Sequence, residues 1–138
     1  RFLYFSRPGG DVLLGTLDTK GPEYAFLRDR VVEAGCDVIL VDAGVMSDPS
    51  PGDITADEVA AAAGESRAAL AAAHDRGRAV LAMTRGATTL IRRLHDGGRL
   101  DGILGLGGSG GSSIIAAVTA LSRAGRSRVT VRTPSSTS

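Results

Sequence analysis

Short apolar runs without polar alternation recur along the chain and predict buried strands. Three of them cover residues 12–16, 38–41 and 101–106, and a fourth candidate covers residues 129–131. A strand without a polar face is buried on both sides, which is typical of a parallel sheet covered by helices. The pattern therefore predicts an α/β fold.

Apolar residues at helical spacing fill the intervals between the expected strands. The first helix is expected to begin at Pro22, because proline suits the first helical position, and to end before Gly35. Thr55 and Glu58 fit a capping box and so predict a second helix start. A third short helix is expected over residues 66–75.

The longest apolar stripe predicts one helix of about four turns before Gly97. Residues 80–83 alone would also fit a strand. The stripe continues at helical spacing, however, through Val80, Met83, Ala87, Leu90, Ile91 and Leu94. Gly86 inside this helix costs about 1 kcal/mol relative to alanine, which indicates that a neighbouring segment comes close there.

A final helix over residues 113–124 completes the order βαβαααβαβ. That order predicts a Rossmann-like three-layer sandwich with a short, mostly parallel sheet over residues 11–131. Residues 1–10 are expected to form a disordered leader. Residues 132–138 show no periodicity, so we expect a disordered tail there.

The glycine-rich segment at residues 105–113 follows the third expected strand and precedes the final helix. Glycines let the backbone approach an anion closely, and the first turn of a helix offers unpaired N–H groups. We therefore expect the segment to bind phosphate through Gly107, Gly108, Ser109, Gly110, Gly111 and Ser112. The alternative is a tight turn that packs the helix against the strand, although such a turn needs fewer glycines.

Two familiar nucleotide motifs do not fit this segment. Its glycines satisfy the G-x-G-x-x-G pattern of dinucleotide sites, but such a site also needs an acidic residue about 20 positions later. No Asp or Glu follows Asp101 in this chain. The segment does not end in the Gly-Lys-Ser/Thr of a P-loop either. A phosphate site of another kind remains the hypothesis.

A second polar cluster lies directly after the first expected strand. It contains Thr16, Asp18, Thr19 and Lys20, and Lys20 is the one lysine among 16 cationic residues. Open parallel sheets bind ligands at the carboxyl ends of their strands. Lys20 would neutralise phosphate charge, and Asp18 would hold Mg²⁺ or a ligand hydroxyl. The alternative is that these residues cap the following helix and leave Lys20 in solvent.

Asp42 ends the second expected strand. An acidic residue at that position contacts ribose hydroxyls in Rossmann-like folds. An exposed loop carboxylate is the alternative, and both interpretations remain open. Elsewhere no nucleophile–base pair and no metal-ligand spacing stands out.

Composition narrows the classes of function. A chain of 138 residues makes one domain, and its formal net charge of +1 gives no electrostatic argument for nucleic-acid binding. A single cysteine excludes an internal disulfide framework, and no run of 18 apolar residues predicts a membrane-spanning helix. We expect a cytoplasmic protein that binds neither nucleic acid nor membrane.

Three linked motifs resemble the UPF0261 family, the family of the Tm-1-like ATP-binding domain. They are Gly15–Glu23, Val41–Val45 and Leu100–Gly111, in an order that runs from about Asp11 to Ala124. Three motifs in order are more specific than one glycine segment. The family's domain is longer, so we expect this chain to be a truncated fragment that holds its N-terminal subdomain.

The resemblance implies binding of a nucleotide, with ATP as the ligand, and is consistent with a bound Mg²⁺. It implies that residues 16–20 and 107–112 face the nucleotide. A second subdomain, or a second copy of the chain, would supply the other wall of the site. The family implies no particular reaction. Two other functions stay open: an enzyme acting on a small phosphorylated or carboxylate metabolite, and a protein-interaction domain.

Overall fold

The computed structural model describes residues 10–97, 100–105, 114 and 116. Within these residues the strands are β1 (Gly10–Gly15), β2 (Val38–Asp42) and β3 (Leu100–Leu104). They form one parallel sheet in the order β2-β1-β3, which confirms the three strands expected from the apolar runs. β1 already includes Gly10, which the sequence had placed in the leader.

The carboxyl ends of the three strands lie at the same edge of the sheet. Gly15 at the end of β1 pairs with Asp42, and Leu13 pairs with Leu104 at the end of β3. From β1 the chain continues to β2 on one side and later to β3 on the other, so the strand order reverses at β1. In open α/β sheets, ligands bind at such a point.

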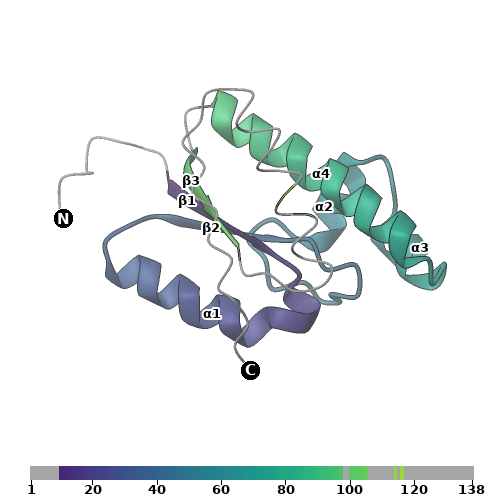
Figure 1. Cartoon of the computed structure of the whole chain (residues 1–138), viewed down its shortest axis with the longest axis horizontal. Coiled ribbons are helices and arrows are strands. Elements are labelled where there is room, and N and C mark those ends of the chain that lie inside the picture. The colour runs from purple at the N-terminus through teal and green to yellow at the C-terminus, as the bar shows by residue number, and fades with distance from the viewer. Residues whose placement is uncertain (1–9, 98–99, 106–113, 115, 117–138) are drawn as a thin grey trace.

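Within the described residues, four helices lie on the two sides of the sheet. They are α1 (Leu17–Glu33), α2 (Ala56–Ala62), α3 (Arg67–Ala72) and α4 (Arg76–Asp96). Figure 1 shows α1 on one face and α2 with α4 on the other. The side chains alternate accordingly: Leu13 and Leu40 pack with Tyr24 of α1, whereas Val12 and Leu14 join the larger core under α2 and α4. The Rossmann-like three-layer arrangement is thus confirmed.

The start of α1 differs from the prediction. The helix begins at Leu17 and not at Pro22, so residues 17–20 form its first turn. Proline has no N–H to donate to the carbonyl of Asp18, and a kink falls at Lys20, whose backbone is non-helical (φ −121°, ψ 23°). The N–H of Leu17 is bound by the distant Asp42 carboxylate at 3.1 Å. This long-range acceptor explains why local sequence signals missed the helix start.

The helix of the long apolar stripe is confirmed as α4, although it starts earlier than the stripe does. Asp75 caps its first turn by accepting a hydrogen bond from the Arg78 N–H at 3.1 Å. A Cβ added to Gly86 would lie 1.8 Å from the carbonyl oxygen of Val59 in α2. The close approach predicted at Gly86 is therefore confirmed, and its partner is the α2 backbone.

The turn between α3 and α4 also departs from the prediction. α3 ends at Ala72, and His74 has a left-handed backbone with φ 51°. The helix expected over residues 66–75 is therefore shorter at its carboxyl end. The predicted capping box at Thr55 and Glu58 is present in full at the start of α2.

Several expectations fall on residues outside the described part of the chain. These are the leader at residues 1–9, the glycine segment at 107–112, the strand at 129–131 and the tail at 132–138. Of the helix expected over residues 113–124, Ile114 and Ala116 are described, and both are helical.

Candidate functional site

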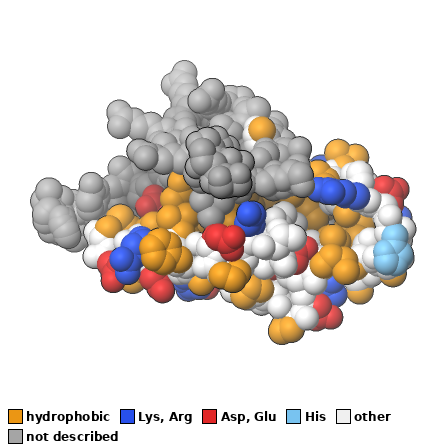
Figure 2. Space-filling model, turned by 60° about the horizontal axis from the view of Figure 1, so that its bottom comes forward, with side chains coloured by type: hydrophobic (Ala, Val, Ile, Leu, Met, Phe, Trp, Pro, Cys, Tyr) orange, Lys and Arg blue, Asp and Glu red, His pale blue; other side chains and the backbone are white. Residues whose placement is uncertain are grey.

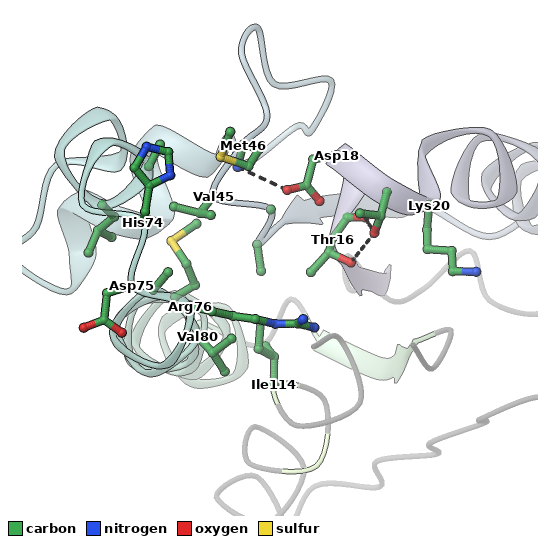
Figure 3. A pocket seen from close by; sticks show the side chains of 17 residues that line it. Thr16, Asp18, Lys20, Val45, Met46, His74, Asp75, Arg76, Val80 and Ile114 are labelled. Atoms are coloured by element: carbon green, nitrogen blue, oxygen red, sulfur yellow. Dashed lines mark hydrogen bonds between the residues drawn. The ribbon is translucent and has the colours of Figure 1, made fainter. Parts of the chain in front are cut away.

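A cavity of about 680 Å³ lies beside the carboxyl end of β1 (Figure 3). Its walls come from the start of α1, from the segment that follows β2, from α3 and from α4. Thr16, Asp18, Thr19 and Lys20 all line it. The structure thus brings together the four residues of the cluster that the sequence singled out after the first strand.

Hydroxyl groups occupy the α1 side of the cavity. The Oγ1 atoms of Thr16 and Thr19 lie 3.0 Å apart, and the Thr19 hydroxyl also donates to the Thr16 carbonyl at 3.2 Å. Thr16 is the residue before the first helical turn, yet its side chain makes no capping bond. The interpretation of this cluster as helix caps is therefore wrong for Thr16.

Asp18 connects α1 to the segment after β2. Its Oδ2 accepts a hydrogen bond from the backbone N–H of Met46 at 3.1 Å. The other oxygen, Oδ1, lies 2.6 Å from the position that a Cβ on Gly44 would occupy, so this glycine is needed for the carboxylate to approach the backbone. Asp18 is exposed and also lines the cavity.

Lys20 lies at the edge of the cavity, beyond Thr16 in Figure 3. Its Nζ is 3.8 Å from Glu23 Oε2, and the two side chains are 39% and 49% exposed. An exposed pair at that distance contributes at most about 1 kcal/mol to stability. The ammonium group can therefore leave Glu23 for a stronger anionic ligand at little cost.

Asp42 is fully buried, so the interpretation of this residue as an exposed loop carboxylate is wrong. Its Oδ1 accepts hydrogen bonds from the N–H groups of Leu17 and Gly44, and its Oδ2 accepts one from the Ser50 hydroxyl at 2.6 Å. The same Ser50 oxygen accepts a bond from the Ala56 N–H at the start of α2. Asp42 is not part of the described cavity wall. This geometry favours a positioning role over direct contact with ribose.

Arg67 also holds the segment that follows β2, and no sequence pattern indicated this role. The side chain is 9% exposed. Its Nη1 donates to the Val45 carbonyl at 2.8 Å, and its Nε donates to Asp57 Oδ1 at 2.8 Å. The sequence offers one weak indication of this role, because Arg67 is the one charged residue in the short, alanine-rich helix α3.

No sequence pattern indicated the rest of the cavity wall either. Most of it is apolar and comes from Val45, Met46, Leu70, Ala79, Val80, Met83 and Ile114. His74, Asp75 and Arg76 join it between α3 and α4, and Figure 3 shows Arg76 extending from α4 toward the sheet. His74 lies in the turn before α4 and is exposed.

Charges are mixed over the described surface. On the face shown in Figure 2, acidic and basic side chains are interspersed with hydrophobic ones. Within the described residues, no three His, Cys, Asp or Glu side chains form a group that could hold a metal ion by themselves. None of the helices in this part of the chain is long and apolar enough to cross a membrane.

The residues expected to bind phosphate in the glycine segment lie outside the described part of the chain: Gly107, Gly108, Ser109, Gly110, Gly111 and Ser112. Residues on both sides of this segment are described. Gly105 is buried directly after β3, and Ile114 is 2% exposed and lines the cavity.

Comparison with known proteins identifies the family. Residues 11–137 match the Uncharacterised protein family (UPF0261) N-terminal domain. A UPF0261 protein of Clostridium tetani is 39% identical over 104 residues, which cover 75% of this chain and 26% of that protein. A UPF0261 protein of Mesorhizobium japonicum is 37% identical over 103 residues, which cover 75% of this chain and 25% of that protein. The chain spans about a quarter of the length of these curated relatives. It belongs to the UPF0261 family.

Proposed function

We propose that this chain binds ATP in the cavity beside the carboxyl end of β1. One observation carries the proposal: the side chains of Thr16, Asp18, Thr19 and Lys20 line a single cavity at the point where the strand order reverses. The sequence singled out these four residues as a phosphate-binding cluster. A volume of about 680 Å³ suits a ligand of nucleotide size. The choice of ATP rests on the resemblance to the Tm-1-like ATP-binding domain.

The α1 side of the cavity has the chemistry that phosphate oxygens need. Lys20 supplies a mobile positive charge, and the Thr16 and Thr19 hydroxyls supply donors. We propose that Gly107–Ser112 adds backbone donors, since its described flanks lie at the end of β3 and in the cavity wall. Asp42 would keep the start of α1 in place.

A magnesium ion fits this arrangement only as a companion of the phosphates. The described part of the chain offers no complete ligand set, but Mg²⁺ commonly takes one carboxylate together with phosphate oxygens and water. Asp18 would be that carboxylate, because it lines the cavity and, among the described residues, only its Oδ2 accepts a hydrogen bond from a backbone N–H. Bound in this way, Mg²⁺ would neutralise phosphate charge.

The rest of the site would come from outside this chain. Because the matched residues cover only about a quarter of each relative, we propose that a further subdomain or a second copy of the chain covers the open side of the cavity.

Thermal unfolding with and without millimolar Mg-ATP tests the proposal. A ligand at one hundred times its Kd stabilises the folded state by about 2.7 kcal/mol, so the melting temperature should rise by several degrees. Lys20→Ala should reduce that rise. The matched control is Arg92→Ala, which removes an exposed cation of α4 that is not part of the cavity wall. Equal melting temperatures with and without Mg-ATP would refute ATP binding by this chain.

A further inference from the structure

We infer that the cavity has two chemically different ends, and that its apolar end takes the flat face of an aromatic heterocycle whose charged tail lies against α1. The inference rests on the proposed function, because it assigns the orientation of a nucleotide in the same cavity. It adds a ring-binding role for Met46, which the sequence gave no reason to select.

The two ends differ in their side chains. At the α1 end, the described wall consists of Thr16, Asp18, Thr19 and Lys20. The opposite wall is mainly apolar and includes Val45, Met46, Leu70, Val80, Met83 and Ile114. His74, Asp75 and Arg76 add polar groups to it at the turn before α4. A ligand that is polar throughout would place polar groups against this mainly apolar wall, which costs free energy. A ligand with an apolar ring and an anionic tail satisfies both ends.

Met46 is an exposed apolar side chain on a fixed backbone. Its side chain is 61% exposed, and it is one of four large hydrophobic residues that are strongly exposed among those described. Its N–H is held by Asp18, and the carbonyl of the preceding Val45 is held by Arg67. Gly44, one residue earlier, is held by Asp42. Three consecutive residues are therefore fixed by hydrogen bonds from three different elements.

This arrangement favours a packing role for the thioether. Met46 and Val45 lie on one side of the cavity in Figure 3, and Val80 of α4 lies on the other. A planar ring between these walls would cover apolar area on both of its faces. Sulfur also makes favourable contacts with aromatic rings. The hydrogen bond between Asp18 and the Met46 N–H would hold the ring end and the phosphate end at a constant separation.

Titration calorimetry with two probes tests the inference: ATP, and inorganic tripolyphosphate, which has the charged tail without the ring. For Met46→Ala we expect the Kd of ATP to rise about tenfold, the loss that corresponds to part of one buried side chain. The Kd of tripolyphosphate should stay unchanged. Met46→Leu keeps the apolar volume and should restore most of the ATP affinity. Leu81→Ala is the matched control, because Leu81 is also 61% exposed but is not part of the cavity wall.

The outcomes separate this inference from the proposed function. If Met46→Ala weakens both probes equally, Met46 acts on the phosphate end through Asp18, and the inference is wrong. It is also wrong if Met46→Ala changes neither Kd, or if the unchanged protein binds the two probes equally tightly, although phosphate binding then stands. If the unchanged protein binds neither probe, the proposed function and the inference both fail.

Discussion

The contact between Gly86 and Val59 allows a test of how closely α4 packs against α2. A Cβ added to Gly86 would lie 1.8 Å from the Val59 carbonyl oxygen and 2.8 Å from its carbonyl carbon. Both atoms belong to the α2 backbone, so no side-chain rotation can relieve the overlap. α2 and α4 must move apart by about 1 Å to admit the methyl group of Gly86→Ala, in an interior packed as densely as a crystal.

Two effects of opposite sign determine the stability of this variant. Alanine is a better helix former than glycine by about 1 kcal/mol, which would raise the free energy of unfolding. Overpacking of a dense core lowers the free energy of unfolding by about 1–3 kcal/mol, and we take about 2 kcal/mol as the middle of that range. The interface that would be forced open contains Val59, Ala60, Ala82 and Ala87, all of which are buried. Overpacking should therefore prevail, and the difference between the two effects gives an expected net loss of about 1 kcal/mol.

Urea unfolding followed by far-ultraviolet circular dichroism measures this difference. Gly77→Ala is the matched control: it makes the same change in the same helix, and its added Cβ would meet only Asp75 Oδ1, at 3.7 Å. We expect Gly77→Ala to raise the urea midpoint and Gly86→Ala to lower it, at unchanged m-values. A rise in the midpoint for both variants would show that α2 moves away at little cost, and the packing argument would be refuted.

Two further predictions concern buried polar groups. Asp42→Ala leaves the buried N–H groups of Leu17 and Gly44 without their acceptor. The free energy of unfolding, measured by urea titration, should fall by about 3 kcal/mol. A loss below about 1 kcal/mol would show that water replaces the carboxylate. Tyr24→Phe removes the hydroxyl that donates to the Leu14 carbonyl at 2.5 Å, and should lower the melting temperature through a loss of about 1–2 kcal/mol, whereas an unchanged melting temperature would contradict it.

Local signals in the sequence predicted the elements that local interactions stabilise. The capping box at the start of α2 needs only Thr55 and Glu58, which are three residues apart. The stripe along α4 repeats within each helical turn, so it was visible in the sequence and is confirmed. Gly86 is unfavourable inside a helix, and this correctly indicated a close contact at that position. The sequence could not show that the contact is with α2.

The features that the sequence did not reveal depend on residues far apart in the chain. Asp42 binds the N–H of Leu17 at a separation of 25 residues, which moves the start of α1 ahead of Pro22. Arg67 reaches back 22 residues to Val45. No local pattern distinguishes such a buried arginine from an exposed one. The four residues at 16–20 lie directly after a strand, and this local signal predicted the edge of the sheet where they line the cavity.

The segment between β2 and α2 shows why these long-range bonds matter for the cavity. It carries Val45 and Met46 into the wall, and two of the side chains that hold its backbone, Asp42 and Arg67, are buried charged groups. Burying a charged group is costly and stabilises a fold only when every bond is satisfied. A short polar turn is sufficient to connect a strand to a helix, so the connection alone does not explain why charged groups are buried here. A wall of a ligand-binding cavity must keep one conformation, and the buried Asp42 and Arg67 hold this segment in one conformation.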